Sequence, residues 1–234
     1  MIKEELPFIK DMFNGIAPTY DLLNRLLSMF QDVYWRKILV HSLPKRKKMM
    51  ILDVACGTGD VMLEIQKKNN AAFIWGLDFS QTMLSLAQNK ITHQSIKPQA
   101  MNLIAANALC LPFKPQTLDA ITIAFGIRNI QNKQMVLNQF YHVLKPNGSV
   151  HILELAIPEH PFLLKCYLLY FKKILPFIGR FLSKNNFAYH YLPDSVLHFP
   201  RPTLFMTSIQ QAGFRHVSYQ PLSFGITNLY IGKK

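Results

Sequence analysis

The sequence contains few cysteines, and none is placed to form a disulfide scaffold. Its 234 residues include only Cys56, Cys110 and Cys166, which lie far apart and form no Cys-x-x-Cys pair. Such an odd, scattered set is typical of a reducing cytosol. The eight histidines also lack the spacing of metal ligands, and we therefore expect no metal.

Long apolar runs are missing as well. The most apolar stretch, residues 162–182, is broken by Lys165, Lys172, Lys173, Pro176 and Arg180. A membrane-spanning helix needs about 20 predominantly apolar residues, so no span is predicted. The first residues are charged and contain no apolar segment, which predicts no secretory signal. We expect a cytoplasmic protein, with peripheral contact to the inner face of the cytoplasmic membrane as an open alternative.

Acidic residues are scarce. The 13 Asp and Glu residues stand against 26 Lys and Arg residues, which gives a formal net charge of +13. Half of the residues are apolar, a composition that excludes a disordered chain, and the length suits one domain. The charge favours an acidic partner, either nucleic acid, anionic lipid or an acidic cofactor.

From residue 49 onward, short apolar runs alternate with helical patterns. The predicted strands cover residues 49–54, 73–78, 101–105, 119–125 and 149–155. Helices are predicted after Ser80, over 133–144 up to a turn at 146–148, and over 203–212 up to Gly213. Apolar strands that alternate with helices predict a doubly wound, mostly parallel α/β sheet with helices on both faces.

We predict a single domain over residues 1–234 with four parts. These are an N-terminal helical cap (1–45), a cofactor-binding core (46–158), a basic helical insertion (159–195) and a C-terminal helix with strands (196–234). Within the insertion, Pro176 and Gly179 favour two short helices over one long helix.

The sharpest motif is the Gly-Thr-Gly sequence at residues 57–59, between the first predicted strand and a helix. Such a turn brings the backbone close to a ligand. A dinucleotide-binding fingerprint needs a third glycine, but Met62 stands at that position. Asp53 and Asp60 add negative charge where a phosphate would bind. The motif therefore disfavours phosphate and favours a cationic ligand.

Asp78 ends the second predicted strand, 19 residues after Gly59. A carboxylate at this place can accept hydrogen bonds from both ribose hydroxyls of a nucleoside. Asn107 and Ala108 follow the third strand, where an adenine would lie. S-adenosylmethionine fits this set best, because it carries a sulfonium and an amino acid instead of phosphates. The alternative is that Gly57 and Gly59 serve only the turn.

Several segments resemble one known family. They cover residues 13–24, 53–60, 107–113, 121–129, 143–148 and 191–196. The segments around Tyr20-Asp21 and from Phe125 to Asn129 are specific to that family, whereas the turn at 144–148 is shared by many methyltransferases. Over nearly its full length the chain resembles the quinone-biosynthesis C-methyltransferases, which methylate demethylmenaquinol or, in a related branch, a polyprenyl benzoquinol.

The resemblance implies the class I fold of S-adenosylmethionine-dependent methyltransferases. It places cofactor contacts on Thr58, Asp78, Asn107 and Ala108. We add Gly57 and Gly59 of the turn, and Asp53 just before it, to the cofactor-binding residues. The chain departs from the family pattern at Cys56, Ala124, Phe224-Gly225 and Tyr230. Residues 17–24 look most like the demethylmenaquinol branch. The implied reaction is C-methylation of a prenylated demethylmenaquinol, the last step of menaquinone biosynthesis, with the benzoquinol of ubiquinone biosynthesis as the alternative.

Methyl transfer to a ring carbon requires that a neighbouring ring hydroxyl loses its proton. We expect Arg128 to stabilise the phenolate or to polarise a water that accepts the proton, because a guanidinium is itself a poor base. Asn129 is expected to orient the quinol oxygen, and Tyr20 with Asp21 to close over the substrate. The alternatives are a surface ion pair for Arg128, helix packing for Tyr20, and hydrogen bonds to the loop amides for Asp53.

Residues 160–193 contain no acidic residue. The cations Lys165, Lys172, Lys173, Arg180 and Lys184 fall on one side of a helical projection, opposite apolar residues. Such a segment is typical of transient contact with anionic membranes, and a lid over the substrate pocket is the alternative. The basic run at 45–48 would suit an RNA-binding or RNA-modifying protein, but it lacks interleaved aromatic residues. We expect no nucleic-acid partner and leave a homodimer open.

Overall fold

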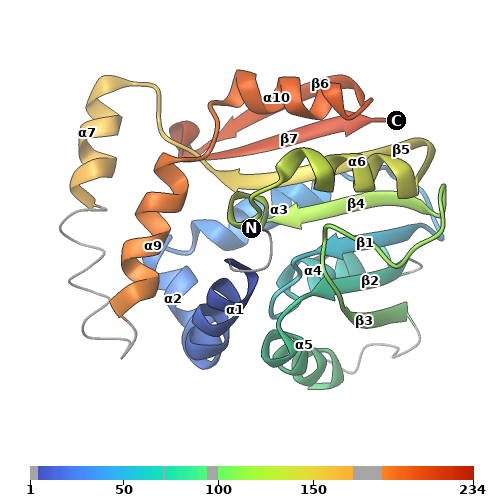
Figure 1. The fold of residues 1–234 in the computed structure, drawn as a ribbon. Helices are drawn as coiled ribbons and strands as arrows, with labels where there is room; N and C mark the ends of the chain where they lie inside the picture. Colours follow the sequence, from blue (N-terminus) through green and yellow to red (C-terminus); the bar gives the residue numbers. More distant parts are fainter. Residues whose placement is uncertain (1–4, 71, 94–99, 171–185) are drawn as a thin grey trace.

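A computed structural model describes residues 5–70, 72–93, 100–170 and 186–234 (Figure 1). The described residues form one seven-stranded sheet in the order β3-β2-β1-β4-β5-β7-β6. The strands are β1 (Met50–Val54), β2 (Phe73–Asp78), β3 (Met101–Ala105), β4 (Leu118–Ala124), β5 (Leu144–Leu155), β6 (Arg215–Leu222) and β7 (Thr227–Lys233). The first five strands are parallel, and β7 runs antiparallel to β5 and β6. The predicted doubly wound, mostly parallel sheet is confirmed.

Helices cover both faces of the sheet (Figure 1). On one face lie α6 (Lys133–Val143) and α10 (Pro202–Gln211); on the other lie α3 (Gln31–Ser42), α4 (Asp60–Lys68) and α5 (Gln81–His93). Strand β1 contributes Leu52 to the apolar cluster on the first face and Ile51 to the cluster on the second. Because both faces are buried, the central strands are continuously apolar in sequence.

The predicted helix after Ser80 begins as expected. The hydroxyl oxygen of Ser80 accepts a hydrogen bond from the backbone N–H of Met83 at 3.1 Å, which caps α5. Strand β5 differs from the prediction, because it begins at Leu144 rather than at residue 149. Leu144 pairs with Leu118 ahead of a register shift, and Asn147 adopts φ 63°, a conformation that asparagine tolerates. The predicted turn at 146–148 therefore lies inside β5.

The N-terminal residues are helical, as predicted. They form α1 (Glu5–Ile16), a 3-10 turn (Ala17–Thr19), α2 (Tyr20–Leu27) and α3. Figure 1 shows α1 and α2 on the same side of the molecule as α7 (Pro161–Leu169) and α9 (Asn186–Leu197), which come from the predicted insertion. Pro176, Gly179 and the cations Lys172, Lys173, Arg180 and Lys184 lie outside the described residues. Within the described ranges, every helix is too short or too polar to cross a bilayer.

Asp53 and His151 are two of the ionisable side chains that are buried in the sheet. Asp53 on β1 is 2% exposed and accepts a hydrogen bond from the Thr122 hydroxyl at 2.7 Å. Burial raises the pKa of Asp53 to about 7. The ring nitrogens of His151 on β5 are hydrogen-bonded to the hydroxyls of Ser42 and Ser149, at 2.8 and 2.9 Å. Burial lowers the pKa of His151 to about 3.

Asp53 and His151 have opposite effects on the pH dependence of stability. Folded Asp53 keeps a proton that the unfolded chain releases above about pH 4, so its contribution to the free energy of unfolding falls as the pH rises toward 7. Unfolded His151 binds a proton below about pH 6.5 that the folded chain rejects, so its contribution rises with pH. Between about pH 4 and pH 6.5 each slope is about 1.4 kcal/mol per pH unit, and the two slopes cancel.

Removing either group should expose the slope of the other. Relative to the unsubstituted chain, the free energy of unfolding of His151→Gln should fall with rising pH in this window, and that of Asp53→Asn should rise by a similar amount. The doubly substituted chain should again show no relative slope. Urea unfolding at about pH 4.5 and about pH 6 measures these differences. Parallel pH profiles for both single variants would contradict the assignment of the two buried groups.

Candidate active site

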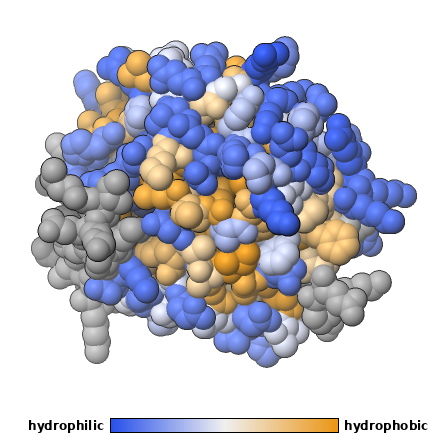
Figure 2. All heavy atoms as spheres, turned by 45° about the vertical axis from the view of Figure 1, so that its right-hand side comes forward, coloured by the Kyte–Doolittle hydropathy of each residue, from blue (hydrophilic) through white to orange (hydrophobic). Residues whose placement is uncertain are grey.

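Two cavities lie side by side at the carboxyl ends of the parallel strands, where α/β folds bind their ligands. The first cavity is formed by α1 and the segments that follow β1, β2, β3 and β4. The second cavity lies among α1, α2, α3, α7 and α9. Figure 2 shows hydrophobic side chains at the surface near the middle of one face, with hydrophilic ones around them.

The glycine turn forms one wall of the first cavity. Gly57 has φ 54° and Gly59 has φ 83°, left-handed values that favour glycine. A Cβ at Gly57 would meet no atom within 4 Å, so the backbone here is open to a ligand. A Cβ at Gly59 would instead lie 3.3 Å from Ala87 of α5. Met62, at the position of the missing third glycine, is fully buried in the core.

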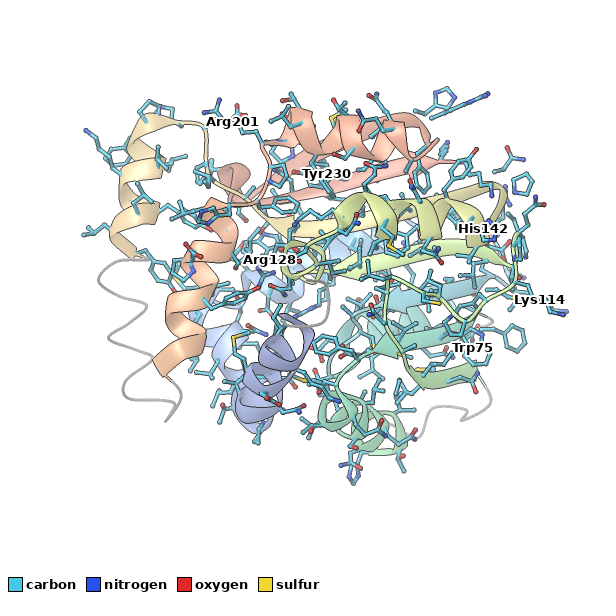
Figure 3. All side chains as sticks on the ribbon, in the orientation of Figure 1. Trp75, Lys114, Arg128, His142, Arg201 and Tyr230 are labelled. Atoms are coloured by element: carbon cyan, nitrogen blue, oxygen red, sulfur yellow. The ribbon has the colours of Figure 1, made fainter. Side chains whose placement is uncertain are left out.

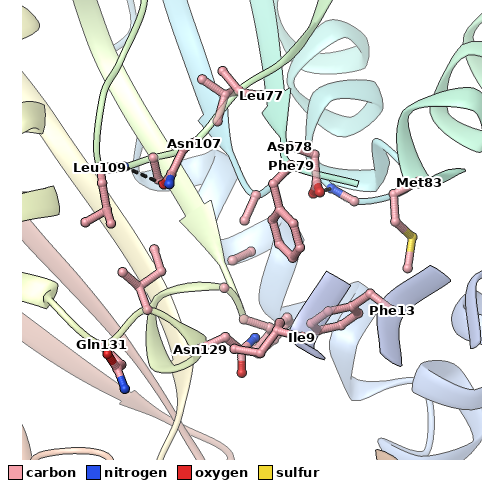
Figure 4. A pocket seen from close by; sticks show the side chains of 18 of the residues that line it. Ile9, Phe13, Leu77, Asp78, Phe79, Met83, Asn107, Leu109, Asn129 and Gln131 are labelled. Atoms are coloured by element: carbon pink, nitrogen blue, oxygen red, sulfur yellow. Dashed lines mark hydrogen bonds between the residues drawn. The ribbon is translucent and has the colours of Figure 1, made fainter. Parts of the chain in front are cut away.

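Asp78 ends β2 at the first cavity (Figure 4). Its two carboxylate oxygens accept hydrogen bonds from the backbone N–H groups of Gly57 and Ser80, each at 2.9 Å. Burial raises the pKa of Asp78, although these backbone donors act in the opposite direction. An ionised carboxylate has about four acceptor positions. Asp78 can therefore fix the glycine turn and still accept hydrogen bonds from two hydroxyls of a ligand.

Asn107 and Ala108, which follow β3 next to Asp78, also line the first cavity. The side-chain oxygen of Asn107 accepts the backbone N–H of Leu109 at 2.9 Å, drawn as a dashed line in Figure 4. On the side of α1, the rings of Phe13 and Phe79 lie edge to face, 6.4 Å apart. Apolar walls with a few fixed polar groups suit the base and ribose of a nucleoside.

Three predicted cofactor residues line neither cavity: Asp53, Thr58 and Gly59. The Thr58 hydroxyl donates to Asp21 at 2.6 Å and accepts from Lys90 at 2.9 Å, so it connects α2 to α5. Asp53 lies within β1 and bonds to Thr122. The loop amide is held by Asp78 instead, through the N–H of Gly57. These three residues therefore stabilise the turn and its surroundings without facing either cavity.

Asp60 connects the N-terminal helices to the core. Its carboxylate lies 2.6 Å from Lys90 of α5, 3.5 Å from Arg36 of α3 and 3.6 Å from Arg25 of α2. Burial opposes ionisation of Asp60, but the surrounding cations prevail and lower its pKa. Protein cations therefore compensate its charge. This corrects the expectation that Asp60 attracts a cationic ligand.

Arg128 lines the second cavity and lies near the carboxyl end of β4 (Figure 3). Its Nη1 donates to Glu154 at 2.7 Å and to the carbonyl oxygen of Phe125 at 2.5 Å, and its Nε donates to Ser195 at 3.3 Å. The side chains of Arg128 and Glu154 are 9% and 0% exposed, which excludes a surface ion pair. Among the described residues, no hydrogen-bond acceptor contacts Nη2.

Glu154 on β5 was not predicted as a site residue. Its carboxylate also accepts the backbone N–H groups of Arg128 at 3.1 Å and Leu155 at 2.9 Å. Burial lowers the pKa of Arg128, but the charge of Glu154 outweighs it, and the pKa is raised. The sequence does carry a signal for Glu154, which is an acidic residue inside an apolar predicted strand. A buried carboxylate needs a cationic partner, so this position indicates a buried ion pair.

Arg36 was also missed. This second buried guanidinium lines the second cavity, pairs with Asp32 one helical turn away, and lies over the ring of Phe125 at 5.5 Å. Burial raises the pKa of Tyr20, whereas the charges of Arg36 and Arg128 lower it. The sequence signal is the Asp32–Arg36 spacing, which is common on exposed helices and therefore indicates no site by itself.

Phe13, Tyr20 and Phe125 line both cavities and form a common partition between them. Phe125 has φ 59°, a conformation that is costly for a bulky residue and is found mainly where a ligand site requires it. Asn129 lines the first cavity and accepts a hydrogen bond from the Tyr191 hydroxyl of the second at 3.1 Å. The predicted residues Tyr20, Arg128 and Asn129 are thus brought to one place.

Comparison with known proteins identifies the family. The sequence model of the ubiE/COQ5 methyltransferase family matches residues 1–234. A ubiquinone/menaquinone biosynthesis C-methyltransferase of Geotalea daltonii is 41% identical over 97% of this chain and 96% of its own length. A demethylmenaquinone methyltransferase of Thermus thermophilus is 39% identical over 95% of this chain and 100% of its own length.

Solved structures share the fold. A SAM-dependent methyltransferase of Thermotoga maritima, described as a possible histamine N-methyltransferase, superposes with a TM-score of 0.66 at 16% identity and covers 96% of this chain and 99% of its own. The [4+2]-cyclase SpnF superposes with a TM-score of 0.71 at 14% identity, and the match covers 97% of this chain and 94% of the cyclase chain. The predicted class I fold is confirmed. The chain is an S-adenosyl-L-methionine-dependent methyltransferase and belongs to the ubiE/COQ5 methyltransferase family.

Proposed function

We propose that this enzyme methylates a ring carbon of a prenylated demethylmenaquinol, the last step of menaquinone biosynthesis. The observation that carries the proposal is the second cavity, which is lined mainly by apolar side chains and also by Arg128. A quinol ring with an attached prenyl chain is apolar but carries oxygens that accept hydrogen bonds. The polyprenyl benzoquinol of ubiquinone biosynthesis has the same chemistry and is the second candidate substrate.

The residues of the first cavity fit S-adenosyl-L-methionine. Asp78 has acceptor positions for two ribose hydroxyls, and Asn107 with Ala108 lies along the wall suited to the adenine. The open space above Gly57 leaves room for the rest of the molecule. When bound, the cofactor supplies an electrophilic methyl group. Thr58 and Gly59 keep the turn in place without contacting this space.

Arg128 is the group that stabilises charge on the substrate. The ring carbon becomes nucleophilic when a neighbouring hydroxyl loses its proton, and the resulting phenolate needs a donor in a water-poor site. Glu154 and the carbonyl of Phe125 occupy Nη1, so Nη2 remains to donate to the phenolate oxygen. The raised pKa of Arg128 keeps it protonated. Arg128 therefore cannot accept the proton, which passes instead to a water molecule at the hydroxyl.

Asn129 and Tyr20 orient the ring. The Tyr191 hydroxyl donates to the side-chain oxygen of Asn129, which leaves the NH₂ group of Asn129 to donate to a quinol oxygen. Tyr20 lies in the partition between the cavities and positions the ring next to the cofactor. Holding the two reacting carbons about 3–3.5 Å apart supplies a large part of the acceleration.

A prenylated substrate partitions into lipid, which supports transient contact with an anionic membrane at the cytoplasmic face. Of the five cations predicted to mediate it, Lys165 lies on α7 and is exposed, and the other four lie outside the described residues. Membrane contact of the insertion, with a pocket lid as the alternative, stays a prediction that vesicle binding tests. A homodimer also stays a prediction, which sedimentation tests.

The substrate class can be tested with methyl-labelled S-adenosyl-L-methionine and a panel of demethylated quinols. We expect the highest rate with demethylmenaquinol, a lower rate with the benzoquinol, and no label in an RNA control. Full activity should remain in excess chelator, because no step needs a metal. Label in RNA alone would exclude the proposed function, and a metal-dependent rate would exclude the metal-free mechanism.

A further inference from the structure

Four large apolar side chains project into solvent beside one end of the second cavity. Leu26, Met29 and Phe30 belong to the end of α2 and the turn into α3, and Phe224 belongs to the turn between β6 and β7. They are 41%, 76%, 60% and 85% exposed. We name these four residues the apolar rim. Contiguous exposed apolar side chains of this size mark a surface that contacts a partner.

The two turns that carry the apolar rim are held together. Ser223 accepts a hydrogen bond from the indole N–H of Trp35 and donates to the side-chain oxygen of Gln31, both at 2.9 Å. Leu27, Ser28 and Ile226 lie close to the rim residues in the chain and line the second cavity. The rim therefore borders that cavity.

Three of the four rim residues adopt a backbone conformation that suits glycine or asparagine. Met29, Phe30 and Phe224 have φ values of 51°, 61° and 60°. Bulky L-residues are rare in this region because the Cβ crowds the backbone. Each side chain is also exposed, so burial in the fold does not compensate the strain. The rim residues thus lower the stability of the isolated chain, which favours a function outside it.

The charges near the rim indicate the partner. In residues 20–42 and 215–233 the only carboxylates are Asp21 and Asp32, which pair with Lys90 and Arg36. Exposed cations are present in the same segments, Lys37 among them. Apolar side chains on segments that carry exposed cations and only paired carboxylates match an anionic lipid surface. A two-fold contact with a second copy would bring like charges together.

We propose that the apolar rim inserts into the surface of an anionic lipid bilayer. The second cavity then opens toward the lipid, and a prenyl chain enters it from the bilayer without crossing water. The route of the prenyl chain rests on the proposed function, whereas the docking surface rests on the rim itself. The proposal places membrane contact on the α2–α3 and β6–β7 turns, in addition to the predicted insertion.

The test uses the full chain carrying Met29→Asn, Phe30→Asn and Phe224→Asn together. Asparagine tolerates the left-handed region, so the thermal midpoint should stay the same or rise. The matched control is Leu204→Gln, because Leu204 is 62% exposed on α10, which packs on the face of the sheet opposite to α3. Binding is measured by cosedimentation with phosphatidylcholine vesicles, with and without phosphatidylglycerol.

We expect the unsubstituted chain and the control to bind the anionic vesicles. The triple variant should bind them at least about 100-fold more weakly, because burying one such side chain is worth roughly tenfold in affinity. Methylation of a short-chain, water-soluble quinol should be unchanged in the variant, whereas methylation of a long-chain quinol in vesicles should fall in parallel with binding.

Undiminished vesicle binding by the triple variant would overturn the proposal. So would a loss of binding that accompanies a loss of thermal stability, because the rim would then serve the fold. Conversion of a dimer to a monomer with unchanged vesicle binding would show that a second copy covers the rim. Failure of the unsubstituted chain to methylate any quinol, with rim-dependent vesicle binding intact, would refute the proposed function and leave the docking surface standing.

Discussion

Replacing Arg128 by lysine is expected to lower kcat by about 10²–10³-fold, the range observed when one donor to a developing oxyanion is lost. Lysine keeps a positive charge opposite Glu154, but it lacks the planar fork that contacts Glu154, the Phe125 carbonyl and a substrate oxygen at once. The Kd for S-adenosyl-L-methionine should change little, because Arg128 does not line the first cavity. Steady-state kinetics and calorimetry separate the two quantities.

The matched variant is Glu154→Gln, which keeps the shape of the side chain and removes its charge. It should leave Arg128 in a buried site without its counterion, and breaking such a pair typically costs about 3–5 kcal/mol of stability. Its kcat should lie between those of the unsubstituted enzyme and Arg128→Lys. A normal kcat for Arg128→Lys would show that another group stabilises the phenolate.

Replacing Asp78 by alanine is expected to raise the Kd for S-adenosyl-L-methionine by at least about 100-fold. Each hydrogen bond to a charged acceptor contributes about 1.5–3 kcal/mol, and the two ribose hydroxyls supply two of them. The glycine turn also loses the acceptor that fixes Gly57. Isothermal titration of the purified variant with the cofactor measures the effect.

Thr58→Val is the comparison that separates the first cavity from its support. The resemblance to the family implies a cofactor contact for Thr58, whereas its hydroxyl is bonded to Asp21 and Lys90. The variant should therefore keep most of its cofactor affinity and lose thermal stability. If Thr58→Val weakened cofactor binding as strongly as Asp78→Ala, the hydroxyl would have to contact the cofactor directly.

The sheet could be predicted because its strands are buried on both faces. Burial leaves continuous apolar runs such as residues 73–77, and the helices between them begin and end at recognisable residues such as Ser80. The start of β5 could not be predicted in this way. Asn147 in a left-handed conformation and the pairing of Leu144 with Leu118 are decided by the neighbouring strand.

Asp78 and Asn107 could be placed at one site because the carboxyl ends of adjacent parallel strands meet at the same edge. The roles of Thr58 and Glu154 could not be predicted from the sequence. Thr58 is bonded to Asp21 only because α2 packs against the glycine turn, and Glu154 meets Arg128 from 26 residues away. No local pattern encodes these pairings, because each depends on how distant elements dock.

The partition formed by Phe13, Tyr20 and Phe125 has a thermodynamic consequence. Each of these side chains contributes to the walls of both cavities, so a ligand that orders them on one side changes the free energy of binding on the other. Linkage is reciprocal: if the cofactor tightens quinol binding by some factor, the quinol must tighten cofactor binding by the same factor. If that factor favours binding, the two reactants are retained cooperatively until transfer, and the loss of either one favours release of the other.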